Sequence, residues 1–268
     1  MLTGIASLLL TTAAAIYTGL ILPLLQQYLQ ARIDRHTKDM DEAQAHRKKV
    51  ALTYLNPLRL WAEETYVRLS EISVRLRRSG DRLPALTYVT HPKTVSQKDA
   101  DWFNGKGCYL ISTCYITACL FATIQQVREN IPYLSFSKER DTELMTLMFY
   151  VSHAFLQDLG VFYVTQPSIG QRLYLPDQNR LMTYREFCLL LQDPEERIWC
   201  DRLINFYIET GQGQKLHRIE AAIVAIANLS QFLDTHIGQG VSLQERLNAE
   251  MKPGNGQAGS SLGNVQGH

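Results

Sequence analysis

The hydrophobic and polar positions of this chain divide it into two uncharged runs and several stretches with a helical period. The first run covers residues 1–31, and its segment from Leu2 to Leu25 is long enough to cross a bilayer as a helix. We therefore predict a transmembrane helix over residues 1–25 that contacts the lipid bilayer through residues 2–25. A cleaved signal peptide is the alternative, but such a peptide should begin with Lys or Arg, and neither precedes this apolar run.

The charge that follows the first run predicts how the chain is oriented. Arg32, Arg35 and Lys38 come directly after it, and Arg47, Lys48 and Lys49 follow. The positive-inside rule then predicts a single-pass protein of the inner (plasma) membrane, with the N-terminus outside and the C-terminal domain cytoplasmic. Residues 26–56 contain neither Gly nor Pro, so we predict a helical stalk there.

Beyond Asn56-Pro57, where a turn or kink is expected, apolar residues recur at steps of three or four. Thr183 to Glu186 and Asp193-Pro194 have the sequences of helix starts. Two short apolar segments, 161–164 and 172–175, flank turn residues and predict a small hairpin. The fold class is therefore all-α, with a cytoplasmic helical bundle over residues 57–252 that contains at most a small β-hairpin.

The C-terminal residues 253–268 are rich in Gly, Ser, Asn and Gln, so we predict a disordered tail. The second uncharged run, Gly107 to Val127, is long enough to be a membrane span or a buried core helix. Its Ser, Thr and Tyr residues make it less hydrophobic than Leu2 to Leu25. This composition favours a helix in the middle of the bundle, and a second span stays open.

Composition and charge exclude few classes of function, but they bear on whether the partner is a nucleic acid. The chain has 27 basic and 26 acidic residues, a formal charge of +1 that gives no reason to expect nucleic acid as a partner. The five cysteines are odd in number, and three lie in the second uncharged run. Buried free thiols in a reducing compartment explain them best, while a disulfide or a metal site remains the alternative.

Residues with possible chemistry are few. His153 and Asp158 could form an acid–base pair, but a spacing of five does not place them well on one helical face. Arg172 and His217 are the other polar residues that could meet them between helices. Gly211-Gln-Gly213 lacks the context of a nucleotide-binding loop. We therefore predict no catalytic, cofactor-binding or metal-ligating residue, and a candidate polar site formed by the four residues His153, Asp158, Arg172 and His217.

Three segments carry a resemblance to a known family. Tyr54-Leu-Asn-Pro-Leu-Arg59, the helix around Ser112-Thr-Cys-Tyr-Ile-Thr-Ala118, and the stretch from Phe162 to Tyr174 resemble a bacterial family of uncharacterised proteins. The resemblance covers most of residues 50 to 237. It implies a membrane helix followed by a helical cytoplasmic body, and it implies no activity.

Together these observations predict a membrane-anchored, non-enzymatic interaction or scaffold protein that binds a protein partner or its own copies as a homo-oligomer. Two alternatives stay open. One is a membrane-tethered enzyme or ligand sensor with its site between bundle helices. The other is a subunit of a larger membrane complex in which Gly107 to Val127 is also embedded.

Overall fold

The computed structural model describes residues 22–80, 82–130 and 138–237, and these are almost entirely helical, with one sheet of two short strands. This confirms the predicted all-α fold with a small hairpin. The predicted span over residues 1–25 lies outside the described residues, apart from Leu22 to Leu25, with which the first described helix begins. The predicted tail, 253–268, also lies outside them.

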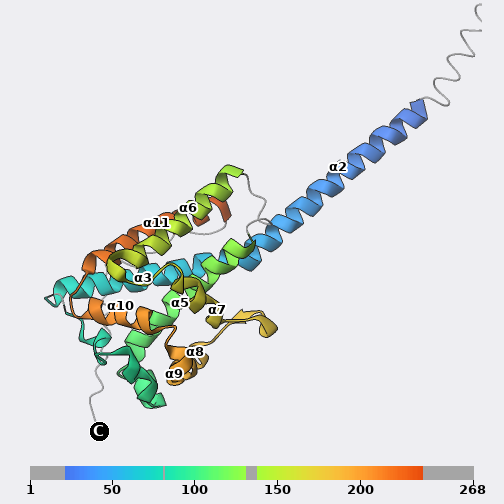
Figure 1. Cartoon of the computed structure of the whole chain (residues 1–268). Helices are drawn as coiled ribbons and strands as arrows, with labels where there is room; N and C mark the ends of the chain where they lie inside the picture. Colours follow the sequence, from blue (N-terminus) through green and yellow to red (C-terminus); the bar gives the residue numbers. More distant parts are fainter. Residues whose placement is uncertain (1–21, 81, 131–137, 238–268) are drawn as a thin grey trace, which may run out of the picture.

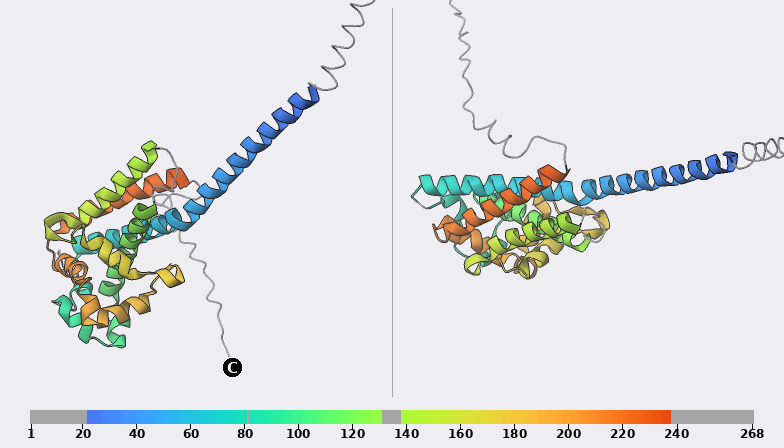
Figure 2. Two further views of the ribbon diagram at one scale, coloured as in Figure 1. Left: turned by 45° about the vertical axis from the view of Figure 1, so that its right-hand side comes forward. Right: turned by 90° about the horizontal axis from the view of Figure 1, so that it is seen from above.

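The described chain starts with a long helical rod that projects from the body (Figure 1). Helix α2 (Leu22–Val50) has 29 residues, a length of about 43 Å at 1.5 Å per residue. A π-helix, η2 (Ala51–Leu55), connects it to α3 (Asn56–Arg78), and α2 and α3 follow one another in nearly the same direction when seen from above (Figure 2). The chain therefore enters the body as a helix and not through a loop.

The sequence predicts a turn or kink at Asn56-Pro57, but both residues belong to helix α3. Pro57 lies in the first turn of α3, where the missing N–H of proline is tolerated because those N–H groups have no partner within the helix. The irregularity is the π-helix that precedes it. Val50 and Leu55, at its two ends, are the first buried residues of the described chain.

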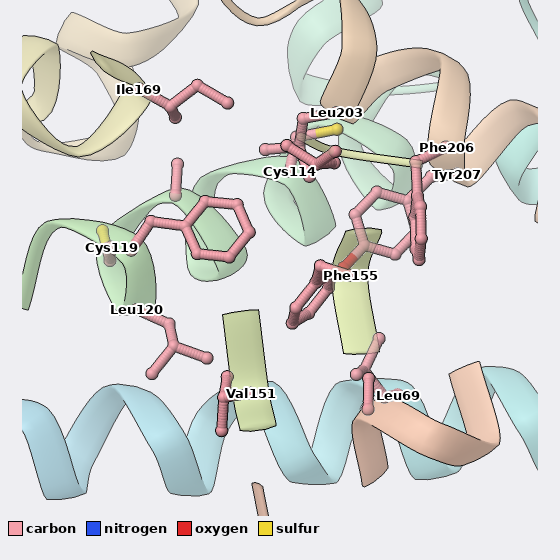
Figure 3. Packing of buried hydrophobic residues seen from close by; sticks show 14 of the residues in the cluster. Leu69, Cys114, Cys119, Leu120, Val151, Phe155, Ile169, Leu203, Phe206 and Tyr207 are labelled. Carbon is pink, nitrogen blue, oxygen red and sulfur yellow. The ribbon is translucent and has the colours of Figure 1, made fainter. Parts of the chain in front are cut away.

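The core lies around helix α5 (Cys108–Asn130), which packs against α3, α7 (Thr165–Leu173) and α10 (Asp201–Gly211). Helix α11 (Leu216–Ile237) packs on α3, and α6 (Lys138–Leu156) packs on α11. Figure 3 shows side chains from α3, α5, α6, α7 and α10 meeting in the interior. The labelled core residues are Leu69, Cys114, Cys119, Leu120, Val151, Phe155, Ile169, Leu203, Phe206 and Tyr207.

Helix α5 is, among the described residues, the one helix long and apolar enough to cross a membrane. Two thirds of its most apolar window (67%) is buried inside the bundle. Its buried threonines satisfy their hydroxyls locally, since Thr117 Oγ1 donates to the Thr113 carbonyl over 2.9 Å. Helix α5 is therefore the central core helix that its composition favoured.

The connection between α3 and α5 packs against the core. Two short 3₁₀-helices, η3 (Pro84–Leu86) and η4 (Pro92–Gln97), and helix α4 (Ala100–Asn104) lie within it. Buried apolar side chains, at spacings that follow no period, attach the connection to the core: Leu83, Leu86, Val89, Val95 and Phe103. The buried Arg197 also donates to the carbonyl oxygen of Lys93 over 2.9 Å.

The predicted hairpin is displaced along the chain. The segment expected to form its turn is helix α7, and the strands are β1 (Tyr174–Leu175) and β2 (Arg180–Leu181), joined by η7 (Pro176–Gln178) and Asn179 in the left-handed region. Gly170 was interpreted as a turn residue, but it lets α7 approach α5. A Cβ at Gly170 would lie 2.8 Å from backbone atoms of Ala122.

The chain continues from β2 into three helices. Thr183 forms the predicted capping box with Glu186 at the start of α8 (Tyr184–Gln192). The predicted start at Asp193-Pro194 is also confirmed, but α9 (Pro194–Arg197) is a single turn, and a separate helix, α10, carries the apolar residues that follow. After α6, a short 3₁₀-helix, η6 (Gln157–Leu159), leads to Gly160, and Leu159 is exposed.

Candidate functional site: a cleft beside the hairpin

A polar cavity of about 800 Å³ lies where the stalk meets the body. We call it the hairpin cleft. Four elements form it: η2, the first turns of α3, the middle and end of α5, and the β1–β2 hairpin. The cleft is lined by Thr53, Tyr54, Pro57, Trp61, Tyr115, Thr123, Gln126, Glu129, Asn130, Tyr174, Asn179, Arg180, Leu181, Met182 and Thr183.

Aromatic rings form one wall of the cleft. Trp61 of α3 packs edge-on against Tyr115 of α5, with ring centroids 5.8 Å apart, and Tyr184 packs edge-on against Tyr115 at the same separation. The Tyr115 hydroxyl donates to the carbonyl oxygen of Met182 over 2.7 Å. Burial raises the pKa of Tyr115 above the ordinary phenol value, so the hydroxyl remains a donor throughout the physiological range.

Amides and hydroxyls form the opposite side, where η2 faces the end of α5. The Tyr54 hydroxyl donates to Asn130 Oδ1 over 3.1 Å, and Asn130 Nδ2 donates to the Gln126 carbonyl over 2.8 Å. This pair of hydrogen bonds connects the π-helix below the stalk to the central core helix. A ligand that displaced Tyr54 would therefore act directly on the joint between stalk and body.

The hairpin side is held by a charged pair. Arg180 binds both carboxylate oxygens of Glu186, with Nη1 and Nη2 each 2.8 Å from an oxygen. The backbone N–H of Thr183 donates to the same carboxylate over 2.7 Å. The Arg180 hydrogen bonds, followed by those of Thr183, lower the pKa of Glu186 to about 2. At the tip, the Tyr174 hydroxyl donates to Asn179 Oδ1 over 2.6 Å.

The side chains that line the cleft determine which contacts it can offer a ligand. The lining contains no His, Cys, Ser or Lys. Across the described ranges, no group of three or more His, Cys, Asp or Glu side chains is placed to hold a metal ion. What the cleft offers is aromatic surface, amide groups and hydroxyls, which bind a ligand by packing and hydrogen bonds.

The four residues of the predicted polar site do not come together in this cleft. Asp158 and His217 form an ion pair at the opposite end of the bundle, where η6 meets the start of α11. Arg172 pairs with Glu196, with Nη2 2.9 Å from Oε1. His153 is exposed on α6, its ring 6.0 Å from that of Phe149. The structure thus unites two of the four residues and separates the others.

The Asp158–His217 pair belongs to a larger charged cluster that sequence reasoning missed. Lys215 Nζ donates to the Asp158 carbonyl over 3.0 Å and lies 3.3 Å from Glu209 Oε2. Arg218 is fully buried, and its Nη2 lies 2.9 Å from the same Glu209 oxygen. Its guanidinium stacks 4.4 Å from the Phe206 ring centroid. This arrangement attaches the start of α11 to α10, so we assign it a structural role.

The sequence contains little that would identify the cleft residues. They come from four separate segments, and none of these segments forms a motif. The recurrence of tyrosines, at 54, 115 and 174, is the one signal that all three main walls share. Their proximity depends on the π-helix and on the position of the hairpin, and the sequence indicated neither.

No protein-family model, curated protein or solved structure matches the chain. The resemblance noted for residues 54–59, 112–118 and 162–174 therefore stays a prediction. The function has to be inferred from the geometry of the cleft and the stalk.

Proposed function

We propose that this chain is a membrane-anchored, non-enzymatic interaction protein of the inner membrane. Residues 2–25 cross the bilayer, α2 is the stalk, and the body binds a segment of a partner protein in the cytoplasm at the hairpin cleft. One observation carries the proposal: α2 directly continues the uncharged N-terminal run and stands clear of the body, with every described side chain from Gln27 to Lys49 exposed.

The cleft supports binding of a protein segment for two reasons. Trp, Tyr and Arg side chains, which are enriched where protein interfaces gain most of their binding energy, lie together in its lining. The cavity of about 800 Å³ has the size of a site for a few residues or a small ligand. Residues 26–50 of the stalk would hold the body about 38 Å from the bilayer and present this cleft to a soluble partner.

The anchor is tested by fractionation of cells that express the full chain. We expect the chain in the membrane fraction, resistant to high salt and alkaline washing, and a variant that lacks residues 2–25 in the soluble fraction. Recovery of the full chain in the soluble fraction would contradict the anchor. A protease added to intact spheroplasts should leave the body intact, because the body is predicted to be cytoplasmic.

The binding site is tested by a photo-reactive amino acid placed at Thr53, on the rim of the cleft, in the membrane-embedded chain. We expect crosslinks to a protein at Thr53 that disappear in the Trp61→Ala variant. Val224, an exposed residue of α11 outside the lining, is the matched control position. Equal crosslinking from Thr53 and Val224 would contradict binding at the cleft.

One observation favours a second candidate, a membrane-tethered ligand sensor. Thr53 and Tyr54 belong to the π-helix and also line the cleft, and π-helices occur frequently at functional sites. A small polar ligand that contacts Tyr54 would change the joint between α2 and α3. Native mass spectrometry of the detergent-solubilised chain tests this candidate, since a co-purifying small molecule that is lost in the Tyr54→Ala variant would favour the sensor.

A further inference from the structure

The stalk carries a narrow apolar stripe that nothing in the described chain covers. Leu29, Ile33 and Met40 are 47%, 57% and 60% exposed, although each is a large hydrophobic residue. At 100° per residue, these three and His36 lie within an arc of about 60° on α2. The steps between them are four, three and four residues, which is the spacing of the a and d positions in a coiled coil.

Charged residues occupy the opposite face of the same helix. Lys38 lies about 180° from Leu29 and forms an i,i+4 ion pair with Glu42, with Nζ 3.8 Å from Oε1. Asp34 is also turned away from the stripe and accepts a hydrogen bond from Gln30 over 3.0 Å. The helix is therefore amphipathic over this stretch. Its charged face interacts well with water, whereas its apolar face is exposed to water without a partner in the described chain.

We propose that α2 forms a parallel two-stranded coiled coil with α2 of a second copy of this chain. Helices in proteins gain most of their stability by packing an apolar face, and no described segment packs on the apolar face of α2. An identical stripe is a complementary partner, because a two-fold axis along the stalk brings the same residues of the two copies together. Leu29, Ile33 and Met40 then form successive layers of the seam.

The proposed membrane anchor supplies the orientation, and the inference rests on it. Two copies anchored through residues 2–25 have their stalks parallel and at the same height, which fixes a common register. The residues that flank the seam permit this pairing. In a parallel dimer, Arg32 faces the uncharged Thr37 of the second copy, so Arg32 meets no like charge across the seam.

The stripe ends before the stalk enters the body. Met40 precedes Val50, the first buried residue, by ten residues, or about 15 Å along the helix.

His36 places one polar layer within the apolar seam. Polar layers of this kind specify the register and the number of strands in coiled coils.

The experiment uses the full chain in membranes with one added cysteine. Met40→Cys places a thiol in the seam, and Lys38→Cys places one on the opposite face at nearly the same height. After mild oxidation, non-reducing gels should show a disulfide-linked dimer for Met40→Cys at a yield at least tenfold above that of Lys38→Cys. Ile33→Asp added to Met40→Cys should remove the dimer, while Ala31→Asp, on the opposite face, should not.

Failure of the coiled coil and failure of the anchor give different results. Met40→Cys that stays in the membrane fraction and crosslinks no more than Lys38→Cys overturns the coiled coil and leaves the anchor intact. A chain found in the soluble fraction overturns the anchor. In that case, a dimer specific to Met40→Cys still supports pairing of α2, and equal yields from both positions overturn it.

Discussion

The hydroxyl of Tyr115 donates a 2.7 Å hydrogen bond to the backbone carbonyl of Met182, and this contact connects the central core helix to the residue that follows the hairpin. Tyr115 also contacts Trp61 and Phe187 through its ring. One side chain therefore positions two walls of the hairpin cleft. The packing of its ring and the hydrogen bond of its hydroxyl can be separated experimentally.

Tyr115→Phe keeps the ring and removes the hydroxyl, leaving the Met182 carbonyl without its donor. We expect the free energy of unfolding to fall by about 1–2 kcal/mol, measured by chemical denaturation, because an unpaired polar group in a partly buried place loses its compensation. Tyr88→Phe is the control, since Tyr88 is exposed and should change stability by less than about 0.5 kcal/mol. Equal effects of the two substitutions would contradict the structural role of the Tyr115 hydroxyl.

The hairpin should loosen in acid because of Glu186. Its pKa is lowered from 4.5 to about 2 by Arg180 and Thr183, so in the folded state it stays ionised at a pH where the unfolded chain would bind a proton. The stabilisation is complete above pH 4.5 and is lost as the pH falls toward 2. Glu186→Gln should remove this part of the pH dependence, measured as the unfolding midpoint between pH 6 and 3.

Arg180→Gln is the matched variant for the same pair. Without the guanidinium, the pKa of Glu186 should rise toward its ordinary value, because the hydrogen bonds from Arg180 are the largest cause of its lowering. The carboxyl resonance of Glu186 in NMR reports this shift directly. A Glu186 that titrates at the same pH in both proteins would show that the Arg180 pair does not control it.

The pair formed by Arg218 and Glu209 should respond asymmetrically to substitution. Glu209→Gln leaves the buried Arg218 guanidinium without its carboxylate, and breaking a buried pair in this way costs about 3 kcal/mol or more. The double variant Arg218→Met/Glu209→Gln removes the buried charge as well. We expect it to be more stable than Glu209→Gln alone in chemical denaturation, and a double variant of equal or lower stability would contradict the prediction.

The sequence predicted those parts of the fold that depend on local patterns. The capping box of Thr183 and the helix start at Asp193 each depend on a few adjacent residues, and each is present. The helical character of the stalk over residues 26–50 followed from the lack of Gly and Pro there. These features need no knowledge of which segments meet.

The errors come from residues whose role is set by contacts with distant segments. Glycine is common in turns, but Gly170 instead allows α7 to pack closely on α5. A local sequence pattern cannot show such a contact. The apolar residues of the connection after α3 follow no period, because short 3₁₀-helices bury them one at a time. His217 and Asp158 meet because left-handed residues at 158 and 159 redirect the chain after α6.

The cysteines provide a test of the core. Burial raises the pKa of Cys119 and Cys200 to about 12 and that of Cys188 to about 11, and Cys114 is raised strongly for the same reason. A rise of two units lowers the thiolate fraction about 100-fold at a given pH, and the thiolate is the form that reacts. Cys108 is half-buried.

We therefore expect a thiol reagent at pH 8 to modify Cys108 first and the other four cysteines only as the fold opens. Denaturant should make all five react at similar rates. The sign of the pH effect follows from the same shifts. Because the unfolded chain loses thiol protons near pH 9 and the folded chain does not, stability should fall as the pH rises above 9. Rapid modification of several cysteines in the native protein would contradict the packing of α5 in the centre of the bundle.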